Sequence, residues 1–509
     1  MRPPAGTRRF RWGLMDKRLV SIFLTGTALM AMSLPSLAQP RRAAAPDPRI
    51  GVLEQQLRDV QLQLAQIKNR QDANDNSAAL SDLKRSTSDE VAGINKRIAS
   101  QPRSNLNNGR FTVTSADGDF SLSLRGLVQF DTGYFAQGRN PPSVDLNSGT
   151  NFRRAQLGFQ GTAWRDWSYN FVYDFGGNGV EGRGYIYTAY IQYDGLKPFG
   201  FRIGAYTPSA GIEDQTGSAD LIFLERPASV DVGRNIAGAP GREAASIYAQ
   251  DDNYLISLSY TGKRTTDGTS TGASVGTFDA QQALIGRASF LAINRSDVKW
   301  LLDGHVTHVL KLADTVPSTG PATTAIRFSS GPELAVDASR TVDTGSIDAK
   351  RATEFGFETA FAYDALYTQG GWYHYGIERR TALPNPDFTG WYALATWSLT
   401  GEQRAYDPAT ASFRQLRPNR PLGSPGGFGA FELKARYSNV DLDYQPFLAT
   451  ASGGVIGGQQ NVWTVGLNWY PNAGIRFALD YDNIQVNHVN APATDISANA
   501  VALRAQISL

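Results

Sequence analysis

The sequence predicts an all-β transmembrane β-barrel of about 16 antiparallel strands, with a short N-terminal α-helical coiled-coil segment before it. The chain opens with an export-type signal, and from about residue 110 apolar and polar residues alternate to the last residue. The 509 residues include 51 Gly, no Cys and 11% aromatic side chains, with a mean hydropathy of −0.31. A barrel strand is apolar on alternate residues only, so low hydropathy combined with many aromatic residues is typical of this class.

Residues 1–38 have the features of a signal peptide. Basic residues precede the apolar run Leu19–Leu34, and Ser36-Leu37-Ala38 then fits the small-x-small cleavage rule. A transmembrane anchor is the alternative, but this run of about 16 residues is shorter than the roughly 20 that span a bilayer. Met15 is an alternative start of the chain. We therefore expect export of a chain that begins after residue 38.

Residues 39–109 are predicted to be a periplasmic leader with a coiled-coil helix and a linker at 99–109. Apolar residues recur at spacings of four and three, first at Leu53, Leu57, Val60, Leu64 and Ile67, then more weakly at Leu80, Leu83, Thr87, Val91, Ile94 and Ile98. Such a seam buries its stripe against a partner helix, so it favours a coiled coil that joins copies of the chain. The alternative is a single amphipathic helix that lies on the barrel.

Residues 110–509 are predicted to form the barrel, because the hydrophobic period changes to two. The alternation is clearest at 120–125, 167–175, 431–437, 463–470, 475–482 and 501–509. One side of it is rich in Trp, Tyr and Phe, while the other carries Arg, Lys, Glu, Asp and Asn. The core of a β-sandwich could not bury such charges, whereas a water-filled lumen accommodates them.

The connections between the predicted strands are of two kinds. Short turns occupy 165–166, 363–365 and 471–474, and longer stretches rich in Gly, Ser, Thr and Pro occupy 137–150, 176–184, 206–245, 262–279, 312–350, 400–427 and 483–497. Short turns on one rim and long loops on the other are typical of outer-membrane barrels. About 400 residues, at roughly 25 per strand with its connection, give about 16 strands, enough to enclose an aqueous lumen.

Several motifs resemble the phosphate-selective porin O/P family. They are FRRAQLGFQG at 152–161, WRDW at 164–167, FRIG at 201–204, LER at 224–226, GWY at 390–392, LTGE at 399–402, GAFEL at 429–433, ARYS at 435–438 and GLNWYPN at 466–472. The resemblance covers roughly residues 120–509. It implies a homotrimeric 16-stranded porin in the outer membrane of a Gram-negative bacterium, which lets small hydrophilic solutes, and phosphate or similar anions in particular, diffuse passively.

The same resemblance implies that arginines and lysines at the constriction bind the anion. Arg153 and Arg154 match the paired arginines of the family's constriction strand. The loop expected to fold inward, about 206–240, carries Asp214 and Asp220 where phosphate-selective members have lysines. Carboxylates there would repel an anion in a throat of low dielectric constant. Two alternatives therefore stay open: a general or weakly selective porin for sugars or amino acids, and a structural barrel that tethers the envelope through its coiled coil.

Six arginines are candidates for a track that guides anions: Arg125, Arg153, Arg154, Arg202, Arg226 and Arg234. Arginine suits this task because it keeps its charge and offers oxyanions a planar fork of donors. The alternative is that these arginines brace the inward loop by pairing with Glu213, Glu225, Asp174 and Glu243. By alternation, Arg125, Arg154 and Arg202 lie on the polar face of their strands, whereas Arg153 has the apolar parity.

Aromatic residues offer one further hypothesis, a track for sugars made by Phe175, Tyr185, Tyr187, Tyr190, Tyr193 and Tyr206. Most of them share the parity of lipid-facing neighbours, which favours a membrane girdle instead.

An enzymatic function is not predicted, because no catalytic or nucleotide-binding motif occurs. His305 and His308 lie three apart on a predicted strand, so they point to opposite faces and cannot share a metal. The 49 Lys and Arg balance 47 Asp and Glu, which excludes a strongly basic nucleic-acid binder. We expect no cofactor, and as partners outer-membrane lipid and lipopolysaccharide, small anions such as phosphate and two further copies in a homotrimer.

Overall fold

The computed structural model describes residues 48–70, 77–107, 110–139, 144–177, 183–267, 280–315 and 323–509. The chain divides into two compact units, Met1–Ala99 and Ser100–Leu509. The signal peptide predicted at 1–38 lies outside the described residues.

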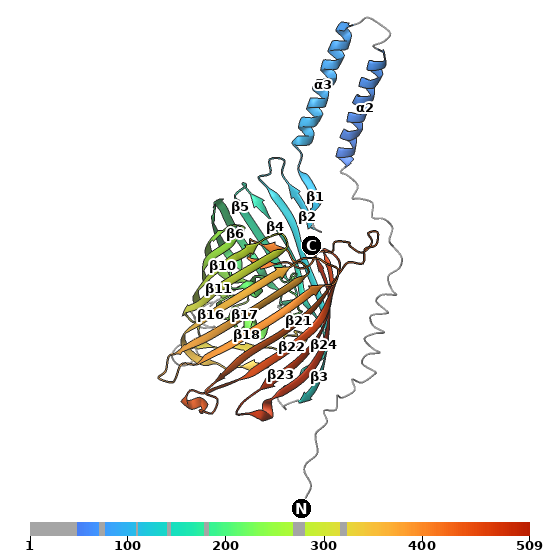
Figure 1. Cartoon of the computed structure of the whole chain (residues 1–509). Helices are drawn as coiled ribbons and strands as arrows, with labels where there is room; N and C mark the ends of the chain where they lie inside the picture. Colours follow the sequence, from blue (N-terminus) through green and yellow to red (C-terminus); the bar gives the residue numbers. More distant parts are fainter. Residues whose placement is uncertain are drawn as a thin grey trace, which may run out of the picture. The chain divides into compact units, whose positions relative to one another are not determined.

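The first unit contains two helices, α2 (Pro48–Arg70) and α3 (Ser77–Ala99), which pack against each other (Figure 1). Both belong to the predicted seams, and Leu53, Val60, Thr87 and Ile94 are buried. The two predicted seams therefore pack against each other, in part, within one chain. The pairing of helices between copies stays a prediction. Neither of the helices described here is long and apolar enough to cross a membrane.

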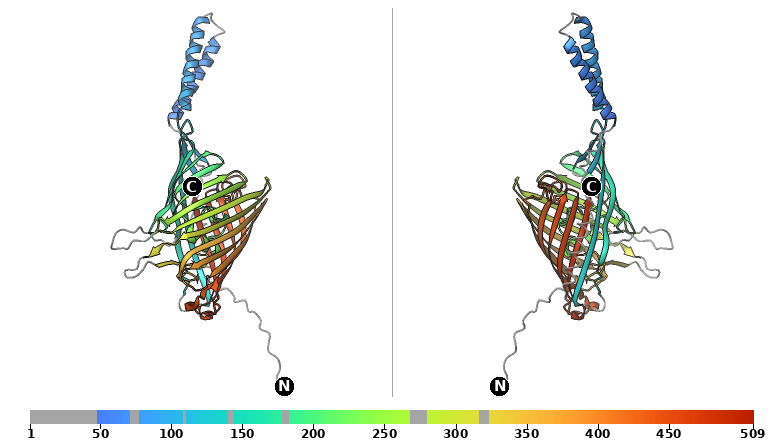
Figure 2. Two further views of the ribbon diagram at one scale, coloured as in Figure 1. Left: turned by 90° about the vertical axis from the view of Figure 1, so that its left-hand side faces the viewer. Right: turned by 90° about the vertical axis from the view of Figure 1, so that its right-hand side faces the viewer.

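The second unit is a closed antiparallel barrel, as predicted (Figures 1 and 2). Among the described residues one sheet has 20 strands, and sixteen of them form the ring once four short strands outside it are set aside. The ring strands are β3 (Ser121–Arg139), β4 (Gly149–Ala163), β5 (Trp167–Asp174), β6 (Tyr185–Leu196), β7 (Phe199–Tyr206), β8 (Arg242–Gln250), β9 (Tyr254–Arg264), β10 (Gln282–Asn294), β11 (Val298–Lys311), β16 (Ile347–Tyr363), β17 (Leu366–Arg379), β18 (Asp387–Ser398), β21 (Ala430–Tyr444), β22 (Val455–Asn472), β23 (Ile475–Asn487) and β24 (Ile496–Ser508). Pairing of β24 with β3 closes the ring, so no sheet edge faces the lipid.

Several short elements lie outside this ring. The hairpin of β1 (Arg103–Asn107) and β2 (Arg110–Thr114) pairs with the start of β3, so five of the eleven residues of the predicted linker at 99–109 belong to a strand instead. The others are β12 (Asp314–Thr315), β13 (Thr323–Ile326), β14 (Ser329–Ser330), β15 (Val342–Asp343), β19 (Tyr406–Asp407), β20 (Ser412–Phe413) and two 3₁₀ turns, η2 (Thr450–Ser452) and η3 (Pro492–Thr494).

The two faces of the wall follow the predicted alternation. On β21, Leu433 is 45% exposed, whereas its neighbours Glu432 and Lys434 are 0% and 4% exposed. On β23, Phe477 and Leu479 are exposed and Asp480 is buried. The apolar side chains therefore face the lipid, and the charged ones face the lumen and what fills it.

The connections also follow the prediction, with one exception. Tight turns join β4 to β5, β16 to β17 and β22 to β23 at one rim, and longer loops lie at the other. The segment 399–429, predicted as 400–427 among the long loops, instead leaves the rim of the short turns, where Ser398 N–H donates to Ala365 O. It carries β19 and β20 into the lumen, where Arg287 donates to the carbonyls of Thr410 and Ala411 at 2.8 and 2.9 Å. Because outer-membrane barrels have their short turns in the periplasm, we call this rim periplasmic and the other extracellular.

Candidate functional site: an arginine-lined cavity beside an inward loop

The connection between β7 and β8, residues 207–241, folds into the lumen as predicted and carries α4 (Ile212–Gln215) and α5 (Ala228–Ala237). Helix α5 packs against β10, β11, β17, β18 and β21. Ile212, Phe223 and Val230 of this inward loop are at most 3% exposed and belong to the main buried apolar cluster. The loop is therefore held against one part of the wall by apolar packing, which alone would not fix its polar backbone.

Charged side chains of the wall bind that backbone. Lys434 donates to Ile222 O at 3.0 Å, and Arg436 donates to Glu225 O at 2.7 Å. Arg504 donates to Leu224 O at 2.7 Å, and Arg476 donates to Leu221 O. These four side chains, which we call the bracing cations, are almost fully buried. They bind four of the five carbonyls of the loop segment 221–225, and buried carbonyls need such donors.

Carboxylates of the wall and of an extracellular loop bind the N–H groups at the two helix starts. Glu358 accepts from the N–H groups of Ile212 and Glu213 at the start of α4. Glu333 accepts from the Ala228 N–H at the start of α5 at 2.7 Å. Both contacts satisfy backbone donors that have no partner within the helix. The inward loop is thus anchored at its carbonyls by cations and at its N–H groups by anions.

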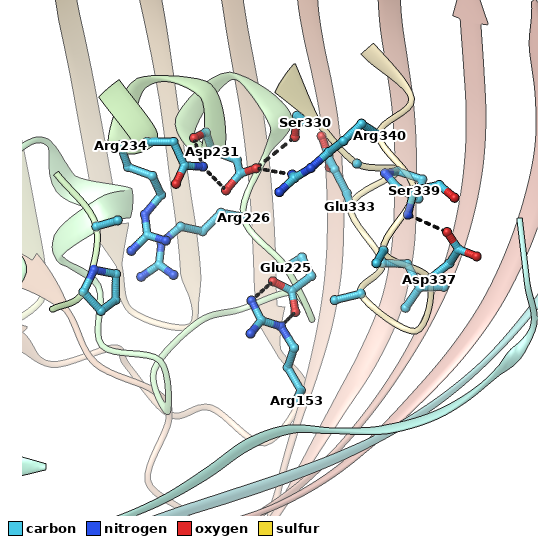
Figure 3. Close-up of a pocket in the computed structure, with 18 of the residues that line it drawn as sticks. Arg153, Glu225, Arg226, Asp231, Arg234, Ser330, Glu333, Asp337, Ser339 and Arg340 are labelled. Carbon is cyan, nitrogen blue, oxygen red and sulfur yellow. Dashed lines mark hydrogen bonds and ion pairs between the residues drawn. The ribbon is translucent and has the colours of Figure 1, made fainter. Parts of the chain in front are cut away.

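A cavity of about 230 Å³ lies beside this loop, and Figure 3 shows the side chains that line it. Its wall includes Arg153 of β4, Glu225, Arg226, Asp231 and Arg234 of the inward loop, Arg264 of β9, and Glu333, Asp337 and Arg340 of the connection between β11 and β16. A second cavity shares Asn235, Arg264 and Arg340 with it and adds Arg242 and Arg327. We call the two together the arginine vestibule.

Arg153 enters this cavity because β4 has a bulge. Gln129 pairs with Arg154 and the next residue of β3, Phe130, pairs with Phe152, so Arg153 is the extra residue. Its guanidinium makes a bidentate contact with Glu225, with Nη2 at 2.9 Å from Oε2 (Figure 3). Strict alternation gave Arg153 the apolar parity, and the bulge explains why it nevertheless points inward.

Arg226 and Arg234 hold the inward loop to itself. Arg226 donates to the carbonyls of Glu213 and Thr216 at 3.0 and 2.6 Å. Arg234 pairs with the Asp214 carboxylate at 2.6 Å. Asp214, which the sequence suggested would repel anions, is therefore buried and neutralised.

The other three predicted arginines also face inward but do not line the vestibule. Arg154 is 5% exposed and donates to Gln129 Oε1 at 2.6 Å. Arg202 donates to Gln192 Oε1 at 2.7 Å, with its guanidinium carbon 4.6 Å from the Tyr190 ring centroid. Arg125 lies near the periplasmic end of β3, opposite Gly158. The six candidates thus divide into Arg153, Arg226 and Arg234 at the vestibule and three outside it.

The tyrosines predicted as a lipid-facing girdle are mostly on the other face. Tyr185 pairs with Asp174, and Tyr190 with Asn170, whose side chains point inward, and Tyr206 is 3% exposed. A bulge between Val172 and Tyr173 shifts the parity of β6. Simple alternation fails there for the same reason as at Arg153.

Of the four carboxylates predicted to brace the loop, only Glu225 pairs with one of the six candidate arginines in the part of the chain described. The Glu213 carboxylate accepts from Gln369 at 3.1 Å, Asp174 accepts from Gln156 at 2.8 Å, and Glu243 lies 4.0 Å from Lys263. The predicted opposition of the two histidines is confirmed: His305 is buried beside Asp303, and His308 bonds to Thr353 on the outer face.

Two carboxylates of the vestibule, Glu225 and Glu333, are neutralised from the wall behind them. Arg504 lies 3.2 Å from Glu225, and Arg436 lies 2.6 Å from Glu333. Burial opposes ionisation of Glu225, but Arg153, Arg154 and Arg504 hold the pKa of its carboxyl well below the usual range. Glu225 therefore stays ionised and paired with arginines, so its negative charge is largely neutralised at the cavity.

Sequence reasoning missed the vestibule arginines Arg242, Arg264, Arg327 and Arg340 and all four bracing cations. The bracing cations lie on the polar parity of strands that were recognised, but alternation does not tell which polar residues meet the loop. The four missed vestibule arginines lie at strand ends and in a long extracellular connection. Their shared place at the extracellular rim was the available signal.

A closed 16-stranded barrel with a lipid-facing apolar belt, a charged interior and an inward loop defines an outer-membrane porin, a channel and not an enzyme. The model of the family "Phosphate-selective porin O and P" matches residues 123–509, and the chain belongs to this family. Porin O of Pseudomonas aeruginosa is 25% identical over 422 residues, which cover 78% of this chain and 90% of Porin O.

Two further proteins are similar to this chain. An uncharacterized protein of Caulobacter vibrioides is 25% identical over 374 residues, which cover 72% of this chain and 68% of that protein. The solved structure of OmpT, an outer membrane protein of Vibrio cholerae, aligns with 77% of this chain and 98% of its own at 10% identity and a TM-score of 0.44.

Proposed function

We propose that this porin favours small anions, with inorganic phosphate or a similar oxyanion as the preferred solute, and that it works as a homotrimer. The observation that carries the proposal is the charge state of the arginine vestibule. Its carboxylates Glu225 and Glu333 are neutralised from the wall behind, whereas the guanidinium groups of Arg226 and Arg264 donate only to uncharged oxygens among the described residues. Seven arginines line the two cavities against five carboxylates, which are those of Glu225, Asp231, Asp267, Glu333 and Asp337. The net charge of the lining is therefore positive.

The geometry suits an oxyanion. Arg264 donates to Asn235 Oδ1 at 2.7 Å, and its Nε atom is buried without a hydrogen-bond partner. Arg340, with a half-exposed side chain, reaches Asp231 only at 3.5 Å. A guanidinium with unused donors can offer a phosphate two parallel hydrogen bonds in a cavity of low dielectric constant.

Arginines at the periplasmic mouth of the pore also favour anions. Arg110 lies opposite Arg125 if the register that pairs Thr112 with Ser123 is continued by two residues. Arg414 and Arg417 lie within electrostatic range of Arg110, together with Asp220. Asp220 accepts from the Gln415 N–H at 2.9 Å, so this carboxylate is also partly committed. An anion that passes the inward loop would meet a second basic region.

The decisive measurement is the reversal potential of the purified protein in a planar bilayer under a KCl gradient, followed by titration with phosphate. We expect anion selectivity and a conductance that phosphate reduces. In the double variant Arg264→Gln/Arg340→Gln both effects should weaken, since the vestibule loses two cations. The matched control is Arg165→Gln/Arg295→Gln, two exposed arginines at periplasmic turns with side chains 72% exposed.

An unselective or cation-preferring conductance that is indifferent to phosphate would refute the anion proposal and favour the general porin. Asp231 and Asp337, which also line the vestibule, are the residues that such a result would implicate. A folded barrel that does not conduct would favour the envelope tether.

A further inference from the structure

A cationic patch lies on the outer surface of the barrel at the extracellular rim, where β11, β16 and β17 end. A cavity of about 490 Å³ there is lined by Lys311, Lys350, Arg379 and Arg380, with Leu310, Leu312, Thr324 and Glu378. Arg351 lies beside it, 3.6 Å from Glu378. We call Lys350, Arg351 and Arg380 the rim cations.

A bulge brings two of these cations to the same face. The register of β16 with β17 shifts between Ala349 and Arg351, so two consecutive residues oppose one position of β17. Ala349 and Ala352 on either side are buried, whereas the side chains of Lys350 and Arg351 are 55% and 47% exposed. In a regular strand two adjacent side chains point to opposite faces. The bulge instead lets both Lys350 and Arg351 point outward.

The rim cations outnumber their carboxylates. Glu378 serves both Lys350, at 3.1 Å, and Arg351, at 3.6 Å. Arg380 has its carboxylate contact with Asp348 at 3.8 Å. Arg379 lines the same cavity, but its Nη1 atom is buried next to Gly453 and adds no donor to the outer surface. The patch therefore carries positive charge and donor capacity that the described residues do not use.

The patch lies directly beyond the apolar belt of the same strands. Phe355, Phe357 and Trp372 point outward with exposures of 52%, 52% and 50%. His308 and His374 follow in register with Thr353 and Phe355, and then come Arg351 and Glu378. Rings that face lipid tails followed by cations at headgroup height form the arrangement that anchors a barrel against anionic headgroups.

Another sector of the same rim lacks this charge. On β21 to β24, the outward residues beyond the aromatic belt are amides that bond to one another or to tyrosines, followed on β21 by the carboxylates Asp441 and Asp443. Asn439 donates to Asn461 Oδ1 at 2.9 Å, and Asn483 donates to Asn499 Oδ1 at 2.8 Å. The positive charge is thus local to β16 and β17 and is not a general property of the rim.

We propose that the rim cations bind the phosphate group of an anionic glycolipid in the outer leaflet. The volume of the cavity suits a phosphorylated sugar headgroup, because small-molecule sites span roughly 300–1,000 Å³. Arginine forks bind phosphate oxygens in pairs, and the long stems of Lys350 and Arg380 can extend along the apolar surface. The chemistry is that of phosphate, and its position at headgroup height, outside the lumen, assigns it to lipid and not to the permeant anion.

The test is retention of lipid by the full-length purified protein, measured by native mass spectrometry after reconstitution into vesicles. The vesicles contain bisphosphorylated lipid A, dephosphorylated lipid A or zwitterionic phospholipid alone. We expect wild type to retain the bisphosphorylated form selectively. The double variant Arg351→Gln/Arg380→Gln should retain it about tenfold less, since each cation near a charged headgroup contributes appreciably to binding.

The control Arg165→Gln/Arg295→Gln removes two arginines that also sit in exposed ion pairs, at the periplasmic rim, and should retain lipid as wild type does. Equal retention by wild type and the rim variant would overturn the proposal. Competition by millimolar inorganic phosphate would instead assign the patch to free anions. Dissociation of the oligomer in the rim variant would assign it to a subunit interface. Conductance should not change in the rim variant, so the result is independent of the pore's selectivity.

Discussion

Two groups of arginines, one in each half of the lumen wall, have different kinds of partner. On β21 to β24, Arg436, Arg476 and Arg504 are at most 2% exposed and donate to carbonyls of the inward loop. On β4 and β7, Arg154 and Arg202 donate to the side-chain oxygens of Gln129 and Gln192. The first set is fixed in contacts that hold the fold together, whereas the second set has neutral partners.

This difference shows why charge on a lumen-facing strand is not by itself evidence for a permeation site. A guanidinium that pairs with a buried carboxylate and a backbone carbonyl has little capacity left for a solute. A guanidinium with a neutral partner is not neutralised by that partner and keeps its charge. The selectivity of the channel should therefore depend on the second set and on the arginine vestibule, and the stability of the loop on the first.

The largest expected effect is on the bracing side. Arg504→Met removes contacts to the Asp131 carboxylate and to Leu224 O and leaves Asp131, which is 0% exposed, without its cation. Breaking a buried pair in this way costs on the order of 3–5 kcal/mol. We expect a lower temperature of barrel unfolding, followed by circular dichroism or by mobility of the folded form on gels.

The same substitution on the other half of the wall is the matched control. Arg202→Met removes a donor to Gln192 and contacts with tyrosine rings, so the loss of stability should be clearly smaller. Equal losses in the two variants would mean that the halves do not differ in the way the contacts indicate.

The second expected effect concerns the segment 399–429 in the lumen. Replacing Tyr406–Phe413, the hairpin of β19 and β20, by a short Gly-Ser linker should raise single-channel conductance, because chain is removed from the lumen on the periplasmic side. Arg404, which pairs with Glu432 at 2.5 Å outside the replaced residues, keeps the start of the segment in place. An unchanged conductance would mean that the hairpin does not restrict the ion path.

Much of this architecture could be predicted from the sequence. The period-two pattern and the count of connections led to the sixteen strands, and the tight turns at 165–166 and 471–474 were recognised, because each signal is local. The rim of the segment 399–429 could not be predicted from its length and composition alone. The rim at which it lies depends on the number of ring strands before it, because successive antiparallel strands end at opposite rims.

The site was less predictable, for two physical reasons. Bulges at Arg153 and in β6 break the alternation, and their effect on side-chain direction appears only in the strand register. The bracing cations depend on contacts between residues far apart, such as Arg504 with Leu224, which no local pattern encodes. The sequence therefore identified the inward loop and three arginines of the vestibule but not what holds or surrounds them.

A smaller effect is expected from Arg154→Gln on the side with neutral partners. Because Arg154 bonds to Gln129 and to no carboxylate among the described residues, its loss should shift the reversal potential toward cations with little change in unfolding temperature. Arg436→Gln should do the reverse, since Arg436 holds Glu333 and Glu225 O. Reversal potentials and melting curves of both variants, recorded together, would separate the two roles. A loss of stability in Arg154→Gln as large as that in Arg436→Gln would contradict the distinction.

The smallest effect should come from mild acid. The pKa of Glu225 is lowered in the folded barrel, so its contribution to stability is fully present above the pKa of an unfolded glutamate, about 4.3. That contribution is lost only as the pH falls from there through the lowered folded value. Between pH 7 and pH 5 we therefore expect the stability difference between wild type and Glu225→Gln to stay constant, and below about pH 4 to shrink. Denaturation series of both proteins across this range measure it. A difference that already shrinks at pH 6 would show that the guanidinium groups of Arg153 and Arg504 do not hold this carboxylate ionised, and the contrast between the two halves of the wall would lose its electrostatic basis at the inward loop.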